Sequence, residues 1–132
     1  MLEQGLVSLI NSNTAVQEIC VNGGYLVELP PNQVLPSWTH TTISEPQEYL
    51  LDGTPSAPTM RRWQVDSYAQ TADVCIKLSA AIANALAGFR GRLSDPDSTG
   101  ICGIFADNLV DFFDSAARTY RRCADYRVFY VR

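Results

Sequence analysis

The clearest periodic pattern in the chain lies over residues 71–87. Thr71 is a suitable N-cap, and Gly88 can end a helix because glycine tolerates the left-handed conformation found there. The apolar side chains between them recur every three or four residues, the spacing of one helix face: Cys75, Leu78, Ile82 and Leu86. The pattern predicts one long helix whose apolar stripe, with small alanines beside it, packs closely on a sheet that includes Val65.

Shorter patterns on both sides of this helix predict the remaining elements. Residues 2–9 have helical spacing, and residues 15–20 fit a turn or a short helical piece. Alternation, or enrichment in β-branched and aromatic residues, predicts strands over five segments: 25–29, 37–44, 60–69, 101–110 and 120–131.

Proline, glycine and small polar residues mark the loops. Residues 45–59 read as one exposed loop, with Leu50 and Leu51 as a possible anchor, and residues 94–100 as a second loop. Residues 111–117 fit neither a helix nor a strand clearly. Together the elements predict one α+β domain over residues 1–132, in which a mixed but mainly antiparallel sheet is packed by one long helix and a short N-terminal helix.

Composition narrows the class of protein. Hydrophobic residues make up 46% and charged residues 18% of 132 residues, which suits a globular core and excludes intrinsic disorder. No apolar run approaches the roughly 20 residues of a membrane helix, and the N-terminal residues lack a signal-peptide pattern. We therefore expect no membrane partner and a protein that stays in the compartment where it is made.

The residue types that carry chemistry are scattered. The four cysteines stand far apart, with no Cys-x-x-Cys pair, and are expected to be buried and reduced: Cys20, Cys75, Cys102 and Cys123. His40 lies in a strand pattern and is expected to be structural. The run Asp95-x-Asp97-x-Thr99-Gly100 resembles the start of a calcium loop, but Ala106 stands where the glutamate ligand is needed, so we expect a solvated loop. We predict no catalytic residues, no metal and no cofactor.

Charge is distributed unevenly along the chain. Residues 1–60 hold six acidic residues and no Lys or Arg, whereas residues 61–132 hold ten basic and eight acidic residues. Nine of the ten bases are Arg, and five of them fall in residues 118–132. An acidic chain without an RNA-recognition or zinc-finger pattern is not expected to bind nucleic acid specifically. Halves of opposite sign suit an ordered assembly.

Two stretches resemble the small tail-completion proteins of long-tailed phages, also called tail-terminator or tail-to-head joining proteins. One runs from the Leu51-Asp52-Gly53-Thr54 turn through Arg62-x-Gln64-Val65-Asp66-Ser67-Tyr68-Ala69 into the alanine-rich helix. The other is the ending Tyr120-Arg121-Arg122-Cys123-Ala124-Asp125-Tyr126-Arg127-Val128-Phe129-Tyr130, preceded by residues 111–114. The motifs follow in order over most of the chain.

The resemblance implies a structural virion protein rather than an enzyme. It would form a hexameric ring at the head–tail neck of a tailed bacteriophage, where it would terminate the tail tube and join it to the head. Its partners would be the tail tube protein and the connector proteins of the neck, and its assembly would take place in the host bacterial cytoplasm. Two alternatives stay open at this point, a head-closure protein of the same neck and a small non-viral binding or regulatory module.

A ring interface joins two different patches, so opposite charge on the two patches would favour head-to-tail order. We therefore predict contacts between arginines of one subunit and acids of the next, involving Arg61, Arg62, Arg118, Arg121 and Arg122 on one side and Glu45, Glu48 and Asp52 on the other. The alternative is that the arginines pair within their own sheet, for example with Asp66 and Asp125.

Overall fold

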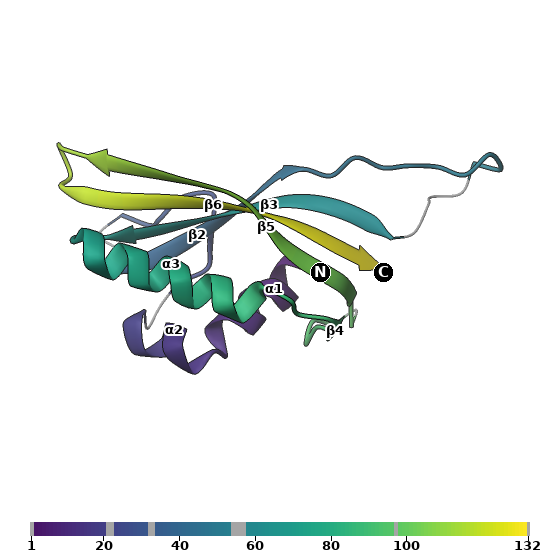
Figure 1. The fold of residues 1–132 in the computed structure, drawn as a ribbon, viewed down its shortest axis with the longest axis horizontal. Helices are drawn as coiled ribbons and strands as arrows, with labels where there is room; N and C mark the ends of the chain where they lie inside the picture. The colour runs from purple at the N-terminus through teal and green to yellow at the C-terminus, as the bar shows by residue number, and fades with distance from the viewer. Residues whose placement is uncertain (1, 21–22, 32–33, 54–57, 97, 132) are drawn as a thin grey trace.

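The computed structural model describes residues 2–20, 23–31, 34–53, 58–96 and 98–131. Figure 1 shows a long twisted sheet with the helices gathered on one of its faces. The elements in chain order are α1 (Leu2–Asn11), α2 (Thr14–Ile19), β1 (Tyr25–Leu26), β2 (Ser37–Ser44), β3 (Thr59–Ala69), α3 (Ala72–Leu86), β4 (Gly91–Arg92), β5 (Gly100–Asp114) and β6 (Thr119–Val131). The predicted α+β class is confirmed.

The sheet is mixed but mainly antiparallel, as predicted. Its strand order is β1-β2-β3-β6-β5-β4, so the two longest pairings, β3 with β6 and β6 with β5, lie at its centre. Among the described strands, only β1 pairs in parallel, with β2. Both edge strands, β1 and β4, are two residues long. Because β4 pairs only with Gly100 and Ile101, it leaves most of the outer edge of β5 uncovered.

Helix α3 packs on the sheet through the predicted stripe. Cys75, Leu78, Ile82 and Leu86 are all at most 3% exposed, and Val65 of β3 lies in the same core. The Thr71 hydroxyl accepts a hydrogen bond from the Val74 amide at 3.3 Å, and Gly88 has a φ of 75° just after the helix. The caps and the apolar face therefore act as the sequence predicts.

The structure differs from the sequence prediction in two boundaries and one additional strand. The strand expected over residues 25–29 ends at Leu26, because Val27 has a φ of 68° and two prolines follow. Residues 111–117 complete β5 as far as Asp114 and then turn, and the Asp114 carboxylate accepts from the Ala116 and Ala117 amides. The short strand β4 was not predicted. Of the turn and the short helix that the sequence left open for residues 15–20, the structure has the helix, α2.

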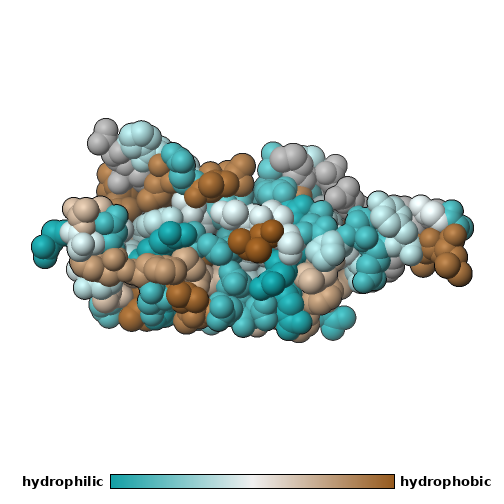
Figure 2. Space-filling model, turned by 90° about the horizontal axis from the view of Figure 1, so that it is seen from above, coloured by the Kyte–Doolittle hydropathy of each residue, from teal (hydrophilic) through white to brown (hydrophobic). Residues whose placement is uncertain are grey.

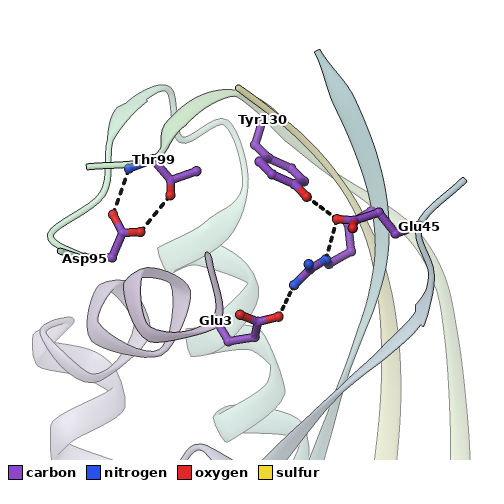
Figure 3. A network of polar contacts seen from close by, with 6 residues as sticks. Glu3, Glu45, Asp95, Thr99 and Tyr130 are labelled. Atoms are coloured by element: carbon purple, nitrogen blue, oxygen red, sulfur yellow. Dashed lines mark hydrogen bonds and ion pairs between the residues drawn. The ribbon is translucent and has the colours of Figure 1, made fainter. Parts of the chain in front are cut away.

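Two expectations about polar and thiol groups were wrong. Cys102 is exposed, whereas the other three cysteines are buried, and it lies where the pairing of β5 with β6 shifts register between Ile101 and Gly103. The 94–100 loop is not simply solvated, since Asp95 is only 6% exposed. Its carboxylate accepts from the Thr99 amide at 2.8 Å and from the Thr99 hydroxyl at 2.7 Å, and this pair closes the loop (Figure 3).

We expect Asp95→Asn to lower the free energy of unfolding by about 1–3 kcal/mol, because an amide nitrogen cannot accept the second hydrogen bond from Thr99. Burial raises the pKa of Asp95 and the hydrogen bonds from Thr99 lower it, and the net result is a pKa below the ordinary value of 3.8. Denaturant unfolding of Asp95→Asn beside the exposed Ser94→Ala measures the difference. Equal stability of the two variants would show that the pair does not hold the loop.

Candidate interaction surfaces

The distal half of the β5–β6 hairpin carries an unusual amount of exposed apolar surface. Every residue of β5 from Phe105 to Asp114 is exposed. Five of them are large and hydrophobic, with exposed fractions between 40% and 54%: Phe105, Leu109, Val110, Phe112 and Phe113. Such a surface on a sheet edge marks either a binding site or an aggregation hazard.

A groove of about 460 Å³ lies where this hairpin meets the loop between β1 and β2. Leu29, Pro30 and Leu35 line it from the loop, and Phe112 and Phe113 line it from β5. Tyr68, Asp114, Ala117, Thr119 and Arg121 complete the lining. The groove is therefore mostly apolar, with charged groups at a few places.

Arg121 is the cation of this groove. Its guanidinium lies over two rings, 5.6 Å from the centre of Phe112 and 5.8 Å from that of Tyr68. It also donates to the Asp66 carboxylate at 2.9 Å, and Asp66 is only 3% exposed. Because 41% of the Arg121 side chain is still exposed, its charge faces the groove as well as Asp66.

A second apolar feature stands at the opposite end of the molecule. Residues 45–53 leave β2 as a long excursion, which we call the arm, and the arm reaches the far end of the long axis in Figure 1. Its tip carries Tyr49, Leu50 and Leu51, which are 64%, 56% and 110% exposed. Figure 2 shows hydrophobic surface at both ends of the long axis, including the tip of the arm.

The base of the arm is fixed by a network of polar contacts (Figure 3). Arg61 of β3 donates from Nε to the Glu45 carboxylate at 2.9 Å, and the Tyr130 hydroxyl of β6 donates to the same oxygen. Arg61 also forms an ion pair with Glu3 of α1 and lies 5.7 Å from the centre of the Tyr130 ring. The network joins the arm, two strands and α1, and the side chain of Arg61 at its centre is 9% exposed, whereas those of Glu3 and Glu45 are 30% and 22% exposed.

The structure shows where the predicted interface residues lie within one chain. Four of the arginines pair with acids of their own chain: Arg61 with Glu3 and Glu45, Arg62 with Asp107 at 3.5 Å, Arg121 with Asp66, and Arg122 with Asp111 through two bonds of 2.6 and 3.0 Å. Arg118 is exposed in the β5–β6 turn, and Glu48 and Asp52 are exposed on the arm. Contacts between subunits stay a prediction.

His40 and the cysteines give no sign of a reactive centre. His40 is 5% exposed and lies between the rings of Trp38 and Trp63, at centroid distances of 6.1 and 5.5 Å. Its burial lowers its pKa, against the opposing effect of Glu3. Burial likewise raises the pKa of Cys123 to about 12, with Asp66 adding to the effect. Over the described residues, no group of three or more His, Cys, Asp or Glu side chains could hold a metal ion.

None of the helices in the described part of the chain has the length and apolar character needed to cross a lipid bilayer.

The groove was not predicted from the sequence, and the prediction that Leu50 and Leu51 anchor their loop was wrong, since both are exposed at the tip of the arm. The groove joins residues 29–35, 68 and 112–121, which only the folded sheet brings together. A signal was present, because Phe112-Phe113 and Tyr49-Leu50-Leu51 are apolar runs inside polar segments.

Comparison with known proteins adds a fold likeness. A protein chain in the "Virion of native gene transfer agent (GTA) particle" superposes with a TM-score of 0.71, at 14% sequence identity, over 98% of this chain and 93% of that chain. The two chains share a fold. No protein-family model matches the sequence, and no curated protein is similar to it in sequence. At 14% identity the likeness concerns the fold and nothing finer.

Proposed function

We propose that this chain is a non-enzymatic structural protein of a tailed-phage virion, and that six copies form a ring at the head–tail neck. The observation that carries the proposal is the fold shared over nearly the whole chain with a protein of a gene transfer agent virion particle. The tail-terminator motifs in the sequence add the finer role. In this role the ring ends the tail tube and joins it to the head.

The distribution of surfaces supports an assembly. The arm and the β5–β6 turn that borders the groove lie at opposite ends of the long axis (Figure 1), and the arm and the groove both expose large apolar side chains. A projecting arm and a groove are two different patches, as a head-to-tail interface requires. Such an interface closes into a ring when the rotation between copies permits. The predicted arginine and acid contacts between subunits belong to this proposal.

The partners follow from the proposed position. One face of the ring would bind the end of the tail tube protein, and the other the head-closure or connector proteins of the neck. Assembly would take place in the bacterial cytoplasm, and the finished protein would reside in the virion. The polar clusters described above are engaged in structural ion pairs, which suits a protein without catalytic turnover.

A head-closure protein on the portal side is the second candidate, because small neck proteins of both kinds can share a fold and a fold does not assign a function. Deleting the gene from the phage or prophage that encodes it, followed by electron microscopy of the particles, tests both. If the protein is a terminator, its deletion is expected to leave overlong tail tubes and separate, filled heads. Tubes of normal length beside heads that lose DNA would favour head closure, and intact infectious particles would contradict both.

A further inference from the structure

The tip of the arm places leucines where a turn normally carries polar residues. The Gly53 amide donates to the Leu50 carbonyl at 2.9 Å, and Gly53 has a φ of 88°, so Leu51 and Asp52 form the corner of a tight turn. Corners of such turns favour Gly, Pro, Asn, Asp and Ser. A leucine at 110% exposure on this corner makes no use of its apolar surface within its own chain.

The charge around this tip is entirely negative. Glu48 precedes Tyr49, Asp52 follows Leu51, and residues 1–60 contain no Lys or Arg. Any partner surface that receives the tip must therefore combine apolar side chains with positive charge.

The groove at the other end has that combination. Its lining is mostly apolar, with half-exposed Phe112 and Phe113 on one side and Leu29, Pro30 and Leu35 on the other. Arg121 presents its guanidinium over the Phe112 ring, and Arg118 is exposed in the adjoining turn. Of the acids nearby, Asp66 is paired with Arg121, and Asp114 accepts hydrogen bonds from two neutral amides of the turn.

We propose that the tip formed by Tyr49, Leu50 and Leu51 of one copy docks in the groove of a second copy, with Glu48 and Asp52 facing Arg118 and Arg121. The occupant is a second copy, because the arm and the β5–β6 turn that borders the groove lie at opposite ends of the chain (Figure 1), so the tip cannot reach the groove of its own chain. The contact is heterologous, and its repetition generates the ring. This inference rests on the proposed ring and names the surfaces that build it.

Paired surface variants test the docking. Leu50→Ser/Leu51→Ser removes the apolar tip, Phe112→Ser/Phe113→Ser removes one wall of the groove, and Ile76→Ser is the control, since Ile76 is a 46% exposed apolar residue on α3. Each double variant is expected to weaken subunit association at least about 30-fold, the effect of losing a strong interface residue. Mass photometry of the wild type and the control should show rings. Rings that persist in both double variants would overturn the proposal.

Mixing the two double variants gives a sharper result, and one that a misfolded variant cannot imitate. The tip variant keeps an intact groove, and the groove variant keeps an intact tip. One functional contact remains in the mixture, so the proposal predicts a 1:1 dimer that grows no further. A mixture that stays monomeric, although both variants have wild-type circular dichroism and melting temperatures, would contradict it.

Cross-linking reports the contact in the assembled protein. In a Cys102→Ser background, Leu51→Cys with Phe113→Cys is expected to give a disulfide ladder on non-reducing gels that ends at the ring size. The matched control is Leu51→Cys with Lys77→Cys, because the Lys77 side chain is 66% exposed on α3, away from the groove. Equal ladders from both pairs, or none from the first, would refute the docking. If the wild type forms rings but the cross-links refute the docking, the proposed function still stands. If the wild type is a monomer, both the docking and the proposed function are wrong.

Discussion

Replacement of Leu78 by alanine is expected to lower the free energy of unfolding by about 2–5 kcal/mol. Leu78 is completely buried in the middle of α3, in the same core as Trp63, Val65 and Tyr126. Its removal leaves a cavity between the helix and the sheet that close packing cannot readily fill.

Urea unfolding followed by circular dichroism measures this loss. Ile76→Ala is the matched control, since Ile76 belongs to the same helix and is 46% exposed; its effect should stay within about 0.5 kcal/mol. A loss below about 0.5 kcal/mol for Leu78→Ala would mean that the stripe does not pack as described.

The second large effect is expected at Arg61. Arg61→Ala removes the guanidinium that both Glu3 and Glu45 contact, in a site where their side chains are 30% and 22% exposed. Breaking a fully buried pair costs about 3–5 kcal/mol, and the partial exposure of both acids reduces the expected loss to about 2–3 kcal/mol.

Arg127→Ala is the control for Arg61→Ala. Its side chain is 45% exposed and lies 3.8 Å from Asp107, an exposed pair whose loss should cost less than about 1 kcal/mol. Adding Glu3→Gln to Arg61→Ala should recover part of the loss, because one uncompensated charge is then removed. Equal effects of the two arginine variants would show that the network does not hold the base of the arm.

The same network predicts a pH dependence. Burial raises the pKa of Glu3, but hydrogen bonds from its backbone and from Arg61 outweigh burial, so the pKa lies below its ordinary value of 4.5. Its contribution to stability is therefore complete above pH 4.5 and is lost as pH falls through the lowered pKa. Arg61→Ala should flatten this acid limb of the stability curve.

The elements with local signals could be predicted from sequence. Helix α3 combines a cap at Thr71, an apolar stripe and Gly88, and alternation marks β3 and β6, so each signal lies within its own segment. The strand at 25–29 failed where one residue, Val27, adopts a positive φ. Residues 111–114 were ambiguous because β5 extends beyond the core there and has no buried face to produce alternation.

The arrangement of charges could not be predicted, because pairing depends on sheet register. Arg121 reaches Asp66 only because β3 lies beside β6, 55 residues away in sequence. Arg61 reaches Glu3 because α1 packs beside α3 on the face of the sheet that the helices cover. The uneven charge of the two halves is visible in the sequence, whereas which arginines remain available to a neighbour depends on the fold.

Native mass spectrometry of the purified protein, with electron-microscopy class averages of the same sample, tests the central claim most directly. Six chains of 14.6 kDa give an assembly of about 88 kDa, and we expect this mass together with ring-shaped averages. A single 14.6 kDa species at micromolar concentration, or open filaments of indefinite length, would contradict a closed ring at the neck of a virion.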